Sequence, residues 1–122
     1  MLLRYLLIAG MVMIGCSNRQ SIKMGASSVK PPAVSFTGGT GESFREAVKI
    51  NGARNQTDGV AAEYYYISNI HGARGSDWYL VGQTVVREKN KIVDVVEIQL
   101  SSASDRRIYY FDVSDFLSRR KR

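Results

Sequence analysis

Between Asp58 and His71 the apolar residues recur at intervals of three and four positions. This spacing places them on one face of a helix, which would be buried against another layer. The residues on that face are Val60, Tyr64, Ile67 and His71. Thr57 and Asp58 stand at a typical helix start, and Gly72 supplies a stop after the last apolar position. We therefore predict a helix over about residues 58–71.

Apolar and polar residues alternate after this helix, which is the period of a strand with one buried face. Three segments follow this pattern: Asp77 to Glu88, Lys91 to Leu100 and Arg106 to Asp112. Polar turns join them at Lys89-Asn90 and at Ser101 to Asp105. Connections this short make consecutive strands antiparallel neighbours.

Strict alternation divides the side chains of each strand between two faces. In the first strand one face holds Trp78, Leu80, Thr84 and Val86, and the other holds Tyr79, Val81 and Val85. In the second strand one face holds Ile92, Val96, Ile98 and Leu100. Asp94 lies on that same apolar face, so it is either at a sheet edge or hydrogen-bonded internally. Glu97 points to the opposite face, so these two carboxylates are not a paired acid and base.

A short strand at residues 47–50 precedes the helix, and Ser114 can cap a final short helix that carries Phe116 and Leu117. The predicted order is strand, helix, three strands and short helix. One main helix packed across a small antiparallel sheet would bury every apolar stripe. The sequence thus predicts a two-layer α+β domain over residues 42–118.

Residues 16–41 contain Pro31-Pro32, Gly38-Gly39 and several serines, with few large apolar side chains. This composition is typical of a flexible tether. Val34 and Phe36 are its only candidates for packing on the domain. The glycine-rich stretch is not a phosphate loop, because no strand leads into it and no Lys-Ser/Thr pair follows.

The first fifteen residues, MLLRYLLIAGMVMIG, join the basic Arg4 to ten uncharged residues from Tyr5 to Ile14. Ten residues is the length of the apolar region of a signal peptide, whereas a helix that spans a bilayer needs about 20. We predict a signal peptide over residues 1–15.

The sequence Met13-Ile14-Gly15-Cys16 resembles the lipobox of bacterial lipoproteins. The resemblance implies that Cys16, the only cysteine, is diacylated as the first residue of the mature protein and anchors it to a membrane. Ser17 is not the Asp that retains such proteins in the inner membrane of enteric bacteria, so the resemblance favours the periplasmic side of the outer membrane. The alternatives are an ordinary secretory signal with a chance cysteine, or a short anchor that stays uncleaved.

The formal net charge is +6, and Arg4 together with the basic tail at residues 119–122 supplies five of the positive charges. The remaining excess is +1, so no basic groove for nucleic acid is indicated. The tail is either a solvated end or a contact for anionic lipid head groups.

His71 is the only histidine, and lipidation would occupy Cys16, so little material remains for a zinc or transition-metal site. We predict neither a metal nor a cofactor. A Ser-His-Asp site can be drawn from His71, Asp77 and several serines, but no nucleophile-elbow motif supports it.

Tyrosine and tryptophan are enriched at binding surfaces, and this chain has 7 Tyr and 1 Trp. The consecutive residues Tyr64 to Tyr66 point about 100° apart on a helix, so they cannot all enter one core. We expect Tyr66, Tyr79 and Tyr110 to contribute to an interaction surface.

The segments AEYYYI, DWYLVGQ, VDVVEI and YYFDVSDF resemble small bacterial exported proteins of unknown function, which supports one domain from Gly59 to Phe116. The leading hypothesis is a non-enzymatic envelope lipoprotein whose domain binds another envelope component, such as a protein. The alternatives are a small envelope hydrolase with His71 as its base, and a structural or surface-masking lipoprotein.

Overall fold

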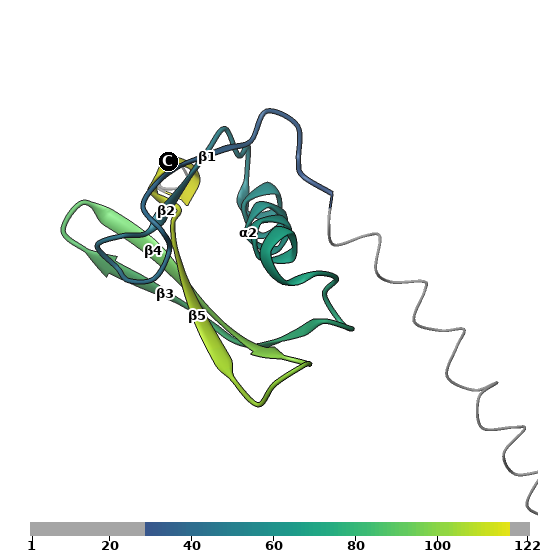
Figure 1. Ribbon diagram of the computed structural model, residues 1–122. Coiled ribbons are helices and arrows are strands. Elements are labelled where there is room, and N and C mark those ends of the chain that lie inside the picture. Colours follow the sequence, from purple (N-terminus) through teal and green to yellow (C-terminus); the bar gives the residue numbers. More distant parts are fainter. Residues whose placement is uncertain (1–28, 118–122) are drawn as a thin grey trace, which may run out of the picture.

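The computed structural model describes residues 29–117 of the chain. Its elements, in chain order, are β1 (Ser35–Gly38), β2 (Val48–Asn51), α2 (Gln56–His71), β3 (Trp78–Glu88), β4 (Lys91–Leu100), β5 (Arg106–Asp112) and α3 (Ser114–Leu117). The strands form one five-stranded sheet in the order β1-β2-β5-β4-β3, and α2 lies across one of its faces (Figure 1). The fold is α+β with one main helix, as predicted. Neither helix of this range is long and apolar enough to cross a membrane.

The sheet is mixed rather than wholly antiparallel. The tightly connected strands β3, β4 and β5 pair antiparallel, which confirms the predicted meander. β2 and β5, however, pair parallel, with Val48 opposite Phe111. The helix and two strands separate β2 from β5 in the sequence, so no short connection fixed their relative direction. The prediction of an antiparallel sheet is wrong at this pair.

β1 lies inside the segment that was expected to be a flexible tether. It pairs antiparallel with β2, with Phe36 opposite Ile50. Val34 is 1% exposed and Phe36 packs against the core, so both docking candidates are used. The prediction of a flexible tether through Gly41 is therefore wrong from Val34 onward. The side chains of Val34 and Phe36 pack on the core, and β1 pairs with the edge of β2.

The helix α2 begins slightly earlier than its apolar pattern indicated. Asn55 is the N-cap, and its side chain accepts a hydrogen bond from the backbone N–H of Asp58. Asp58 sits in the first turn, where a carboxylate complements the helix dipole. Gly72 ends the helix with φ +110°, a conformation that favours glycine. The predicted stop is confirmed, and the start moves from residue 58 to Gln56.

A β-bulge between Leu80 and Gly82 changes the faces of β3. Beyond it, Gln83 lies opposite Val96, which is fully buried in the core under α2. One extra residue in a strand exchanges the faces of all residues that follow. Gln83 therefore points toward the helix, and Thr84 is exposed on the other face. The predicted strict alternation is wrong beyond the bulge.

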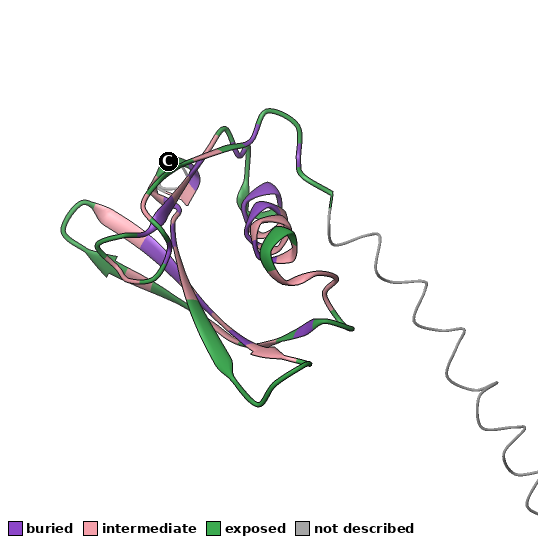
Figure 2. Cartoon of the chain, viewed as in Figure 1, coloured by how far each residue is buried: buried purple, intermediate pink, exposed green. Residues whose placement is uncertain are grey.

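The core lies between α2 and the sheet (purple in Figure 2). Its largest fully buried apolar side chains are Trp78, Phe111, Ile50, Ile67 and Ile98. Each such side chain stabilises the fold by about 1.5–3 kcal/mol relative to exposure. The short helix α3 covers the start of α2, because the ring of Phe116 rests directly on Gly59. The opposite face of the sheet carries no helix in the described range (Figure 1).

Candidate functional site

A groove runs between the edge strand β1 and the helix α2, and we call it the α2–β1 groove. Its volume is about 530 Å³, within the range of ligand-binding pockets. On the β1 side it is lined by Lys30, Ser35 and Phe36, and on the α2 side by Tyr65, Tyr66, Asn69 and Ile70. The walls therefore combine three aromatic rings and one aliphatic side chain with three polar residues.

The aromatic rings of this groove are held in place by one another. The ring of Phe36 stacks on Tyr65 at 6.3 Å between centroids and meets Tyr66 at 5.3 Å. Tyr66 also contacts Phe111 of the core edge-on at 5.6 Å. Ile70, by contrast, is 52% exposed on the rim. The groove thus combines a rigid aromatic wall with an exposed apolar residue.

The backbone of β1 adds hydrogen-bonding capacity to the same place. β1 is the end strand of the sheet, with β2 as its one paired neighbour in the described range. The amine of Lys30 donates to the carbonyl of Val34 at 2.7 Å, which fixes the chain just before the strand. A groove between a free strand edge and a helix can accept an extended peptide as an additional strand.

The three tyrosines expected at an interaction surface do not meet on one face. Tyr66 lies on the α2 side, in the groove. Tyr79 lies opposite Gln99 and Tyr110 opposite Val95, both on the sheet face away from α2. Tyr79 is 48% exposed, whereas Tyr110 is half-buried. Tyr79 and Tyr110 thus share the face away from α2, but their partners Gln99 and Val95 stand four residues apart along β4.

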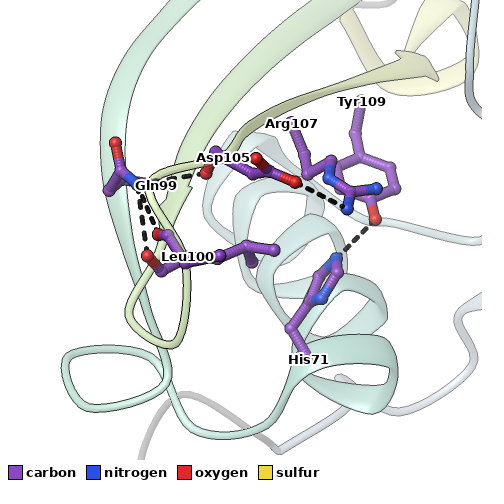
Figure 3. Close-up of polar contacts among 7 residues, drawn as sticks. His71, Gln99, Leu100, Asp105, Arg107 and Tyr109 are labelled. Atoms are coloured by element: carbon purple, nitrogen blue, oxygen red, sulfur yellow. Dashed lines mark hydrogen bonds and ion pairs between the residues drawn. The ribbon is translucent and has the colours of Figure 1, made fainter.

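The side chain of His71 contacts Tyr109. It extends from the end of α2, and its Nε2 lies 2.6 Å from the hydroxyl of Tyr109 on β5 (Figure 3). Burial, and then the positive charge of Arg107, lower the pKa of His71 from its ordinary value. Asp77, the acidic residue of the hypothetical Ser-His-Asp site, accepts a hydrogen bond from the backbone N–H of Ala73. The structure thus gives both residues local structural partners.

A buried polar cluster, which the sequence analysis did not anticipate, joins α2 to β3 and β4. Glu63 is 1% exposed and Asp94 is 7% exposed. The amide nitrogen of Gln83 donates to Glu63 Oε1 at 2.9 Å and to Asp94 Oδ2 at 2.7 Å. The hydroxyl of Tyr64 donates to Gln83 Oε1 at 2.8 Å. The internal hydrogen bonding predicted as one option for Asp94 is confirmed.

Glu63 is a missed member of this cluster that the sequence pattern could have revealed. It stands three positions after Val60 and four before Ile67, so its spacing places it on the buried face of the helix. Burial, and then the charge of Asp94 and a hydrogen bond with it, raise the pKa of Glu63 well above its ordinary value, against the opposing effect of Gln83. The carboxyl group of Glu63 is therefore held in its neutral form over a range of pH in which an exposed glutamate is charged.

Several predicted features lie outside the described residues: the signal peptide at 1–15, the lipidation site Cys16 and the basic tail at 119–122. Within residues 29–117, no group of three or more His, Cys, Asp or Glu side chains is arranged to hold a metal ion. Comparisons of the chain with protein-family models, with curated proteins and with solved structures find no match.

Proposed function

We propose that this protein is a bacterial envelope lipoprotein, anchored through Cys16 to the periplasmic side of the outer membrane, whose domain is a binding module. Its target is an extended segment of another envelope protein, and the α2–β1 groove is the site. The observation that carries the binding proposal is the aromatic wall of this groove beside the free edge of β1.

Two kinds of contact would contribute to this binding. The edge of β1 would supply backbone hydrogen bonds, which give affinity for any extended chain. Phe36, Tyr65 and Ile70 would contact alternate side chains of the bound segment, which gives specificity. The rings of the wall are already packed against one another, so little side-chain entropy would be lost on binding.

The anchor and the groove lie close together in the sequence. Thirteen residues separate Cys16 from Lys30, which lines the groove. A coil of that length has an end-to-end distance of roughly 20 Å. Such a tether would keep the groove near the membrane surface, where partners with membrane-proximal extended segments are available.

The anchor is tested by labelling growing cells with a palmitate analogue. Wild-type protein should carry the label and partition with membranes, and Cys16→Ser should lose both properties. Ser17→Ala is the matched control, because it changes the adjacent residue and leaves the thiol. Unlabelled wild-type protein in the soluble fraction would contradict the proposed anchor.

The groove is tested by photo-crosslinking in cells. A photoreactive amino acid replaces Ile70 in the groove or, as the control, Ile108 on the sheet face away from α2. The two positions are similarly exposed, at 52% and 45%. We expect a discrete adduct from position 70, which mass spectrometry should map to one extended segment of an envelope protein. The variant Tyr65→Ala should reduce the yield of this adduct. Adducts from position 108 alone would place the interaction on the other face and contradict the groove as the site.

A further inference from the structure

The buried polar cluster has fewer hydrogen-bond donors than its carboxyl oxygens require. Glu63 and Asp94 together present four oxygens, and Gln83 Nε2 is shared between two of them. Asp94 Oδ1 is buried and has no hydrogen-bond partner. A buried acceptor without a donor costs about 1–3 kcal/mol, and more for a charged group. Two carboxylates in this place would therefore share the one amide donor of Gln83 and leave Asp94 Oδ1 without any donor.

The surroundings of the pair contain no cation that contacts either carboxylate in the described range. The titratable or charged neighbours are Tyr64 on α2 and Arg74 in the turn after it, whose guanidinium lies 4.4 Å from the centre of the Tyr64 ring. β3 contributes the uncharged Gln83, and β5 places Phe111 opposite Asp94. The single amide nitrogen of Gln83 donates to an oxygen of each carboxyl group, which brings the two groups close together. A proton on one of them would supply the missing donor.

We propose that Glu63 and Asp94 hold a single shared proton, and that this proton fastens α2 to β3 and β4, so that its loss releases the helix from the sheet. With the proton present, the pair carries one negative charge, which the amide of Gln83 stabilises. Without it, two like charges face each other in a site of low dielectric constant. The repulsion is relieved when α2 moves away and water enters.

The β-bulge of β3 is what makes this arrangement possible. It turns Gln83 inward, so that its amide reaches both the helix and β4. In strict alternation Thr84 would occupy the inner face, and its short side chain could not bridge two carboxyl groups. Bulges of this kind commonly re-aim a side chain at a functional position.

The same helix forms one wall of the α2–β1 groove. On the assumption that the proposed function is correct, release of α2 would also change the shape of the binding site, so that partner binding would weaken as the pH rises. The shared proton itself does not depend on that assumption, and its test below measures only the unliganded protein.

The test follows thermal unfolding of the full chain in detergent, from about pH 5 to pH 9. Glu63 is neutral in the folded state above its ordinary pKa of 4.5, so the unfolded state releases the proton first. The contribution of Glu63 to the free energy of unfolding is therefore complete below pH 4.5. It declines as the pH rises toward the raised pKa of the folded state. The equilibrium constant for unfolding should increase by up to tenfold per pH unit in this window.

Glu63→Gln replaces the shared proton with an amide donor that does not titrate. We expect this variant to fold and to lose the decline seen in wild type. Glu97→Gln is the matched control: Glu97 lies on the same strand as Asp94 but on the opposite face, in an exposed pair with Arg106. This control should keep the wild-type pH dependence. Amide exchange, corrected for the intrinsic rate, should show that α2 loses protection before β4.

Infrared spectroscopy of the wild type detects the proton directly and does not require a variant that folds. At neutral pH we expect the carbonyl band of one protonated carboxylic acid, lost at high pH and absent from Glu63→Gln. No such band, together with equal pH dependence of wild type and Glu63→Gln, would overturn the proposal. So would stabilisation of the wild type by millimolar Ca²⁺ that Glu63→Gln abolishes, because the pair would then be a cation site.

Discussion

The indole N–H of Trp78 donates a hydrogen bond to the carbonyl of Gly72 over 3.0 Å. Gly72 ends α2 and Trp78 begins β3, so this bond closes the turn that places the helix over the sheet. The ring of Trp78 is fully buried and meets Tyr64 edge-on at 5.9 Å. One side chain thus joins the turn, the helix and the sheet.

We expect Trp78→Ala to lower the free energy of unfolding by about 3–5 kcal/mol, because it leaves a large cavity and an unpaired carbonyl. Trp78→Phe should lower it less, since it keeps most of the apolar volume and loses the hydrogen bond. Chemical denaturation of the full chain in detergent measures both. Tyr79→Phe, at the next and exposed position, should stay within about 0.5 kcal/mol of wild type. Equal stability of Trp78→Ala and wild type would contradict the role given to this turn.

The parts of the fold that the sequence predicted well are those fixed by local pattern. The helical period between Val60 and His71 and the short turns of the meander each determine an element without reference to distant residues. The parallel pairing of β2 with β5 depends on contacts across about 60 residues of sequence, and no local signal encodes it. β1 was missed for a similar reason, because its stability comes from the edge of β2.

The candidate site shows the same division. Asp94 was recognised as anomalous because an acidic residue interrupted an apolar stripe. Its partner Gln83 could not be found in this way, because the bulge between Leu80 and Gly82 moves it to the inner face. The isolated Gly82 within the strand is a local sign of a bulge, but it does not by itself give the new register. The α2–β1 groove likewise requires the placement of β1. Tyr66 is half-buried beside Phe36 and Phe111, and these neighbours in space were not predictable from the sequence.

The contact between Gly59 and Phe116 gives a second test of packing. A Cβ on Gly59 would overlap the ring of Phe116, far inside van der Waals contact. Gly59→Ala should therefore destabilise the protein by about 1–3 kcal/mol, although alanine has the higher helix propensity. Gly82→Ala is the control, because its Cβ would meet nothing within 4 Å. In a double-mutant cycle, Phe116→Leu should recover part of the loss, and strictly additive effects would show that the two residues do not interact.

The burial of His71 and its position near Arg107 predict a pH effect of opposite sign to that of Glu63. The pKa of His71 is lowered, first by burial and then by Arg107, so the unfolded state takes up its proton more readily than the folded state. The contribution of His71 to stability is thus complete above its ordinary pKa of 6.5 and declines as the pH falls toward the lowered value. Arg107→Gln should raise the pKa of His71, measured by NMR titration of the ring. Arg106→Gln is the matched control, since it removes a neighbouring charge that is paired with Glu97. An equal rise in both variants would assign the effect to overall charge.

The side chain of Val34 places the segment before β1 inside the folded domain. Val34 is 1% exposed and belongs to the core cluster, whereas Val29, five residues earlier, is 66% exposed. Val34→Ala removes two buried methyl groups, so the free energy of unfolding should fall by about 2 kcal/mol. Val29→Ala makes the same chemical change at an exposed position and should stay within about 0.5 kcal/mol of wild type. Chemical denaturation compares the two variants directly. If both variants left the free energy of unfolding unchanged, residues 34–38 would belong to the flexible tether and not to the folded domain. The α2–β1 groove would then lack its β1 side.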